Sequence, residues 1–287
     1  MNYKGEYLNP LVIFAFKKMF ATEASKDVLI SFLNSVFKGH RHVADLVYVD
    51  DKHQGKGLSN GELLLDLLCT DDEGKSFDVE LQVGRHQDFE ERAIFHAFRL
   101  MQKQRFEKPK DIAASEPLRD VYVIALLEDC IEGMPSDKYK HHVCICGTSE
   151  GEADDEQLNI VFIELPKFMK TCGELETELD QWVYVFKNMG NIDALPVSMQ
   201  QKVFETLFSI AERSKLSDEE SIAYDSSLKY KLAHDLVVEL ELKRKQRKSR
   251  RAEFLVFRCT PVNGMAKGRA GETHEYVIGP LRKMRRH

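Results

Sequence analysis

Three polar residues, Asp66, Glu80 and Gln82, have the types and the spacing that chemistry at a metal ion requires. Asp66 interrupts an otherwise apolar run, and an ionised carboxylate in such a run needs a partner, for which a metal ion is suitable. Residues 77–83 alternate between apolar and polar, and this period of two places Glu80 and Gln82 on one face of a strand. Two carboxylates that converge from adjacent strands, with a hydrogen-bonding side chain beside them, suit a hard divalent cation such as Mg²⁺.

A β-hairpin is the local element expected to position these side chains. The polar segment 71–74 separates two apolar runs and ends in Gly74, a residue that readily adopts positive φ in a tight turn. Asp78 shares the strand face with Glu80, and we expect it to be an edge residue outside the site.

The order Asp, hairpin turn, Glu-x-Gln resembles the signature of the Rpn-like PD-(D/E)XK nuclease family transposases, the recombination-promoting nuclease family. In the wider superfamily the motif is more often Glu-x-Lys. The resemblance extends over about residues 1–235 and is carried by six segments: 29–34, 66–82, 89–93, 162–168, 182–184 and 224–229. It implies an α/β fold, a restriction-endonuclease-like core with a mixed central sheet flanked by helices, plus a C-terminal helical region. The implied activity is Mg²⁺-dependent endonucleolytic cleavage of DNA, associated with recombination or mobile elements.

The resemblance also implies roles for the residues of the hairpin. Asp66 and Glu80 would be metal ligands, together with the backbone carbonyl of Leu81, which lies between two side chains of the same strand face. Gln82 occupies the position of the usual lysine. Its amide can orient a water molecule and donate a hydrogen bond, but it brings no positive charge.

Residues outside the hairpin are expected to complete the site. An upstream acidic residue is usual in the superfamily, and Asp27 is the favoured candidate because its segment resembles the family's N-terminal helix. Arg92 is expected to contact a substrate phosphate or to pair with Glu80. Phe95 and Phe98 are expected to be core residues, with base stacking as the alternative role.

The pattern of apolar residues predicts alternating helices and strands followed by helices alone. Helices are expected at 11–20, 26–37, 87–106, 175–188, 198–212 and 218–242, and strands beyond the hairpin at 42–49, 121–127, 139–145 and 158–163. Trp182 is assigned to the core. Three regions follow: a nuclease-like α/β core at 1–170, a helical subdomain at 171–242, and a basic tail at 243–287. The tail is rich in Gly and Pro and is expected to be disordered or ordered only on a partner.

Composition limits the class of protein. At 287 residues and 43% hydrophobic content the chain can form a substantial core, and no apolar run reaches the ~20 residues that span a bilayer. The N-terminus lacks a signal-peptide pattern, so we expect a cytoplasmic protein without a membrane partner. The six scattered cysteines favour reduced thiols. Residues 241–287 carry a net charge of +10 and the rest −16, so only the tail gives electrostatic support for DNA binding.

Two other functions remain open. The replacement of lysine by Gln82 and the acidic body favour a non-catalytic DNA-binding or regulatory module on a nuclease fold. A third hypothesis is an interaction scaffold whose C-terminal helices form a homodimer.

Overall fold

The computed structural model describes residues 5–49, 63–84, 89–106, 118–131, 133–145 and 158–258. The chain divides into two units, residues 1–243 and residues 244–287. The first unit contains the sheet and the helices that cover it. Of the second unit, the described residues are the C-terminal part of one long helix. None of the described helices is both long and apolar enough to cross a membrane.

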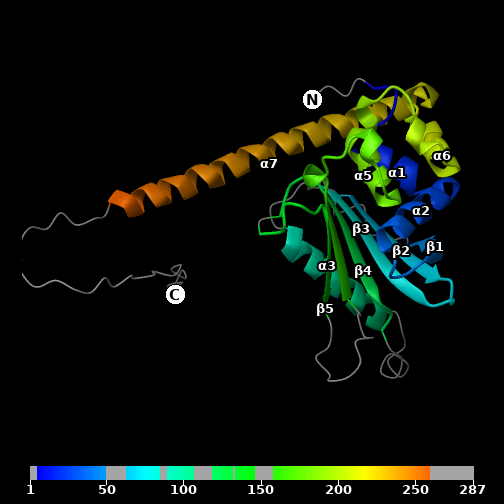
Figure 1. Cartoon of the computed structure of the whole chain (residues 1–287), viewed down its shortest axis with the longest axis horizontal. Coiled ribbons are helices and arrows are strands. Elements are labelled where there is room, and N and C mark those ends of the chain that lie inside the picture. The colour runs from blue at the N-terminus through cyan, green and yellow to red at the C-terminus, as the bar shows by residue number, and fades with distance from the viewer. Residues whose placement is uncertain are drawn as a thin grey trace, which may run out of the picture. The chain divides into compact units, whose positions relative to one another are not determined.

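A six-stranded mixed sheet forms the centre of the first unit, in the order β1-β2-β3-β4-β6-β5 (Figure 1). The strands are β1 (Val43–Tyr48), β2 (Leu63–Asp71), β3 (Ser76–Gly84), β4 (Val121–Leu127), β5 (Lys140–Ile145) and β6 (Leu158–Glu164). β1, β2 and β3 pair antiparallel, β3, β4 and β6 pair parallel, and β5 is antiparallel to β6. β4 and β6 are buried along their whole length, as expected for apolar strands covered on both faces. The expected mixed α/β sheet is confirmed.

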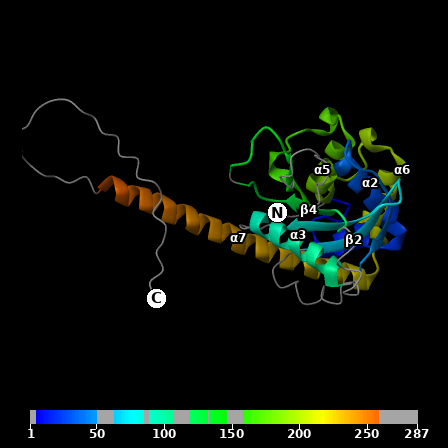
Figure 2. The same ribbon diagram turned by 90° about the horizontal axis from the view of Figure 1, so that it is seen from below.

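Helices cover both faces of this sheet, α3 on one face and four helices on the other (Figure 1). The helices are α1 (Ile13–Phe20), α2 (Lys26–Phe37), α3 (Phe89–Phe106), α5 (Glu178–Asn188) and α6 (Lys202–Ala211). Figure 2, turned by 90°, shows α3 lying across the strands. Because alternate side chains of a strand point to opposite faces, Val79 and Leu81 enter the large core under the four helices. The polar residues between them face α3.

An aromatic cluster holds the four helices together. The ring of Trp182 lies 5.6 Å from that of Phe32 and 4.9 Å from that of Phe204, and Phe20 stacks on Phe186 at 5.5 Å between centroids. Trp182 is fully buried, which confirms its assignment to the core. Aromatic pairs of this geometry contribute about 0.5–1.5 kcal/mol each beyond their burial. The cluster joins helices from both halves of the sequence into one core.

A buried carboxylate, Asp180, joins the start of α5 to Tyr139, the residue that precedes β5. It accepts hydrogen bonds from the hydroxyl of Tyr139 at 2.8 Å, from Nζ of Lys170 at 2.9 Å and from the backbone N–H of Thr177 at 2.9 Å. Burial by itself would raise the pKa of Asp180, but the hydrogen bonds from Lys170, Tyr139 and the backbone outweigh it. The pKa is lowered to about 2.

The helix expected at 218–242 is longer than predicted. α7 (Asp218–Arg258) continues through the basic run at the start of the tail, which was expected to be disordered or ordered only on a partner. The reason is local, since that run consists mainly of Lys, Arg and Gln, which are good helix formers, with no Gly or Pro before Pro261. Residues 259–287 of the tail lie outside the described part of the chain.

Phe95 and Phe98 were expected in the core, but they are 66% and 56% exposed. α3 packs on the sheet with a stripe that includes Ala93 and Ala97, whose small side chains let the helix lie close to the strands. With 3.6 residues per turn, Phe95 lies about 160° around the helix from Ala97. The apolar character of these phenylalanines therefore does not bring them into the core.

Candidate functional site

Asp66 and Glu80 lie directly opposite each other on β2 and β3. The turn between the strands contains Gly74 at φ 78°, whose N–H donates to the carbonyl of Asp71 at 3.0 Å. The predicted hairpin is therefore confirmed, and it aims both carboxylates at the face covered by α3. Asp66 is 4% exposed and Glu80 is fully buried, so both are carboxylates removed from bulk water.

Gln82 lies beside Glu80 on the same strand face, as the period of two predicted. Its Nε2 donates to Oε1 of Glu80 at 2.6 Å, and its side chain is buried. Asp78, expected at an edge, is instead buried in the middle of the sheet. It accepts from Nε2 of Gln104 at 2.7 Å and from Nε of Arg119 at 3.1 Å, so its partners are structural.

Three basic side chains of α3 reach the two carboxylates, and sequence reasoning did not find them. Nδ1 of His96 lies 2.7 Å from Oε1 of Glu80. Nη2 of Arg99 donates to Oε2 of Glu80 and lies 3.4 Å from Oδ1 of Asp66, and Nζ of Lys103 lies 3.9 Å from Oδ2 of Asp66. The spacing i, i+3, i+7 places these residues on one helix face. This spacing could have shown from the sequence that the three residues share a helix face. It does not show which strand that helix face contacts.

The surroundings shift the two carboxyl pKa values in opposite directions. Burial and the charge of Glu80 raise the pKa of Asp66 to about 6, against the opposing effect of Arg99. Burial would also raise the pKa of Glu80, but its contacts with His96 and the charges of His96 and Arg99 outweigh burial and lower the pKa to about 2. Asp66 is therefore the carboxyl of the pair that protonates first.

The donor chemistry fits a hard divalent cation. Among the described residues no group of three or more His, Cys, Asp and Glu side chains is arranged to hold a metal ion. The hairpin itself offers the carboxylates of Asp66 and Glu80 and the amide of Gln82. Oxygen donors of this kind suit Mg²⁺, which usually keeps several water ligands. Burial, and then the charge of Glu80, raise the pKa of Asp66, and a cation beside the pair would favour its ionised form. Arg99 partly fulfils this role through its guanidinium.

A small cavity of about 140 Å³ begins beside Asp66 and extends along α3 to Asp78. Lys103 and Arg119 also line it. Since a water molecule takes about 30 Å³, the cavity has room for a few waters but not for a nucleotide. A substrate would have to approach the carboxylates from outside it.

The remaining expected site residues lie elsewhere or stay untested. Asp27 is exposed on the first turn of α2, a helix that packs on the other face of the sheet. None of the described contacts joins it to the carboxylates. Arg92 begins the same helix face as His96 and Arg99, and partial burial lowers its pKa. Arg99, on the same helix face, reaches Glu80 with its guanidinium. Leu81 lies at the centre of the sheet, with its side chain in the large core.

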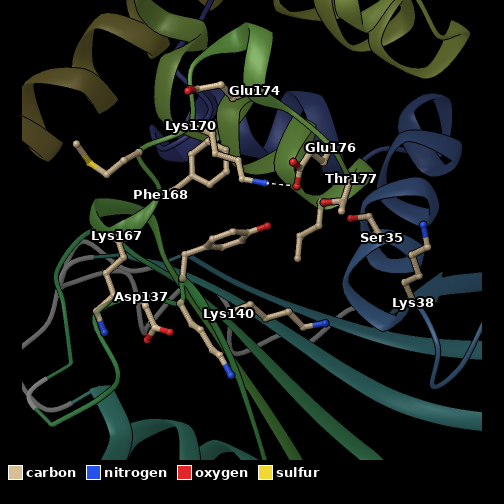
Figure 3. Close-up of a pocket in the computed structure, with 14 residues that line it drawn as sticks. Ser35, Lys38, Asp137, Lys140, Lys167, Phe168, Lys170, Glu174, Glu176 and Thr177 are labelled. Atoms are coloured by element: carbon tan, nitrogen blue, oxygen red, sulfur yellow. Dashed lines mark hydrogen bonds and ion pairs between the residues drawn. The ribbon is translucent and has the colours of Figure 1, made fainter.

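A larger pocket of about 920 Å³ lies on the opposite face of the sheet (Figure 3). It is rich in lysines, but three of them already have partners within the fold. Lys140 donates to the carbonyl of Val36 at 2.6 Å, and Lys170 pairs with Asp180. Nζ of Lys167 pairs with Oε2 of the buried Glu164 at 2.7 Å. The pocket is lined by stabilising contacts and is remote from the facing carboxylates, so it is not the candidate catalytic centre.

Comparison with known proteins agrees with the geometry of the hairpin. A family model described as PD-(D/E)XK nuclease family transposase matches residues 10–241, which include the whole sheet, both carboxylates and α3. No curated protein and no solved structure matches the chain. The six-stranded mixed sheet flanked by helices is consistent with the restriction-endonuclease-like fold. Because the match covers most of the sequence, this chain belongs to the PD-(D/E)XK nuclease family transposases.

Proposed function

We propose that this protein is a divalent-metal-dependent endonuclease that hydrolyses phosphodiester bonds of DNA, in a process linked to recombination or mobile elements. The observation that carries the proposal is the buried pair Asp66 and Glu80, which face each other across the hairpin beside a row of basic residues from α3. Buried like charges with shifted pKa values are typical of functional sites. Membership of a nuclease family supports DNA as the substrate.

Asp66, Glu80 and the carbonyl of Leu81 are the residues proposed to hold Mg²⁺. When bound, the ion supplies a nucleophilic water of lowered pKa and charge stabilisation of the phosphate. The chain supplies the orientation of these ligands. Gln82 holds Oε1 of Glu80 with its amide N–H, which fixes the carboxylate and leaves the amide oxygen of Gln82 to orient a water.

Arg99 is proposed to provide the positive charge that the usual lysine of the motif would provide. Its guanidinium touches both carboxylates, and its side chain is 34% exposed, so it can also reach a phosphate at the site. Arginine binds phosphate through a planar fork of donors that remains charged at all relevant pH values. Lys103 adds a second charge beside Asp66. The positive charge at the proposed site is therefore supplied by side chains of α3, whereas the usual lysine of the motif would lie on β3.

The second candidate is a non-catalytic DNA-binding or regulatory module. The observation that favours it is the position of Arg99 between the two carboxylates, where it already compensates their charge without a metal. This function predicts DNA binding that is indifferent to Mg²⁺ and to the Asp66→Ala substitution.

Plasmid cleavage separates the two candidates. Supercoiled DNA is incubated with wild type in Mg²⁺, with wild type in EDTA, with Asp66→Ala, and with Asp193→Ala, which removes an exposed carboxylate remote from the hairpin. The nuclease proposal expects nicking or linearisation by wild type and Asp193→Ala, and none in the other two samples. Cleavage by none of the samples, with binding intact in a gel shift, would support the non-catalytic module.

We also propose Asp27 as the upstream acidic residue of the site. In that role Asp27→Ala lowers cleavage at saturating Mg²⁺, whereas an unchanged rate removes Asp27 from the site.

We further propose that the protein forms a homodimer. Light scattering tests this, because a dimer has twice the mass of the 33.1 kDa chain.

A further inference from the structure

α3 carries two adjacent rows of side chains, one directed at the facing carboxylates and one directed at solvent. The first row, which we call the cationic row, points at the facing carboxylates and consists of Arg99 and Lys103, with the buried imidazole of His96 beside them. The second, the aromatic row, points to solvent. It consists of Phe95, Phe98 and Phe106, which are 66%, 56% and 79% exposed.

The aromatic row is not required for packing α3 on the sheet. Ala93, Ala97 and Leu100 form that contact and are nearly or fully buried. Single exposed apolar residues are common on protein surfaces, but three phenylalanines gathered on one helix indicate a surface that another molecule covers.

The aromatic row begins at the edge of the carboxylate site. Phe95 precedes Arg99 by four residues, so the two side chains are neighbours on the helix surface. The ring of Phe95 also contacts that of His96, at 5.7 Å between centroids and 88° between planes. His96 in turn touches Glu80. A molecule bound to Phe95 therefore lies within one side chain of the proposed catalytic centre.

We propose that the aromatic row stacks on unpaired bases of a DNA strand whose phosphates follow the cationic row, so that the protein prefers single-stranded or locally unpaired DNA. This inference rests on the proposed function, since it assigns the substrate class of the same site. Aromatic side chains stack on the face of any base, but only where that face is free of neighbouring bases. In a duplex the faces are already covered.

The geometry of the helix agrees with this role. Phe95 and Phe98 lie one turn apart on α3, and residues i and i+3 share a helix face. Both exposed rings are therefore presented on one surface.

Charge distinguishes a nucleic acid from a protein partner at this surface. An apolar protein surface would cover the phenylalanines but would gain nothing from Arg99 and Lys103 beside them. A single strand has both parts, an anionic backbone for the cationic row and aromatic bases for the aromatic row. Combining stacking with a basic track is the general solution for binding single strands.

Fluorescence anisotropy in EDTA tests the inference without cleavage. A labelled single-stranded oligonucleotide and the duplex of the same sequence are titrated with wild type, Phe95→Ala, Phe98→Ala and the double variant. Met169→Ala is the matched control, because Met169 is 79% exposed and lines the pocket on the other face of the sheet. Thermal unfolding checks that the variants fold, which is expected because the replaced rings are exposed.

Wild type should bind the single strand more tightly than the duplex. Each alanine variant should weaken single-strand binding by about 5- to 150-fold, the range measured for stacked bases. Duplex binding and the dependence of affinity on salt should not change, because no charge is removed. Phe95→Trp should retain the affinity and Phe95→Leu should lose it, since leucine is apolar but not flat.

Three results would overturn the inference. Equal affinity of wild type for single strand and duplex, with unaltered binding by the double variant, would remove the stacking role while plasmid cleavage could still establish the nuclease. No binding of either DNA by wild type would overturn the inference, and plasmid cleavage in Mg²⁺ would then decide separately whether DNA is the substrate. A change from dimer to monomer in the double variant, with DNA binding unaffected, would make the aromatic row a protein interface.

Discussion

Replacing Asp66 by asparagine is expected to stabilise the folded protein while abolishing cleavage. The side chain is 4% exposed, and burial together with the charge of Glu80 raises its pKa to about 6. The ionised carboxylate is therefore less favourable in the folded chain than in the unfolded chain. Asparagine keeps the shape of the side chain and an oxygen acceptor for Arg99, but it carries no charge.

The size of the effect follows from the shift in pKa. A rise in the pKa of Asp66 from 3.8 to about 6, at 1.36 kcal/mol per pKa unit, lowers the free energy of unfolding by about 3 kcal/mol when the carboxyl is ionised. For a carboxyl whose pKa is raised by folding, the favourable contribution is present below the unfolded value of 3.8 and is lost as the pH rises through about 6. Asp66→Asn should therefore match wild type below about pH 4. It should be more stable by about 3 kcal/mol near pH 8, or about 6–12 °C in Tm.

Asp180→Asn is the matched control with the opposite sign. Asp180 is also nearly fully buried, but its hydrogen bonds lower its pKa from 3.8 to about 2. The stabilisation that ionised Asp180 gives the folded protein is fully present above pH 3.8 and is lost as the pH falls through about 2. The variant should lose about 2 kcal/mol near pH 7, and the loss should shrink in acid.

Urea unfolding in EDTA, measured from about pH 4 to pH 8 for wild type and both variants, checks this reasoning. Mg²⁺ should then stabilise wild type but not Asp66→Asn, because a ligand that binds only the folded state shifts the unfolding equilibrium. A less stable Asp66→Asn near pH 8, or a difference from wild type that does not change with pH, would refute the argument. In that case burial and repulsion by Glu80 would not set the pKa of Asp66.

Three further substitutions have defined outcomes. Arg99→Gln should lower Mg²⁺-dependent plasmid cleavage by about tenfold or more, and adding Gln82→Lys should restore it; failure of the rescue would place the role of Arg99 elsewhere. Glu164→Gln should lower the free energy of unfolding in urea by about 1.5–3 kcal/mol, because the half-buried Lys167 loses the charged acceptor of its hydrogen bond to Glu164. Trp182→Ala should cost about 3–5 kcal/mol by creating a cavity in the aromatic cluster, and a loss below about 1 kcal/mol would contradict that packing.

Local patterns in the sequence were sufficient for the strands and for the hairpin. The apolar run of β4 has the predicted bounds, and the alternation in residues 77–83 correctly placed Glu80 and Gln82 on one face. These predictions succeed because the period of a strand and the preferences of a turn depend on neighbouring residues. The end of α7 was predicted too early because charge and Gly content were given more weight than helix propensity.

The sequence by itself determined the family, the two facing carboxylates and the amide beside them, because all three lie on one hairpin. Only the tertiary structure decided that Arg99 and His96 of α3 complete the site, and that Phe95 faces solvent. The period of a helix shows which of its residues share a face. Which face meets the sheet depends on how closely the helix can approach, and here the small side chains of α3 made that contact.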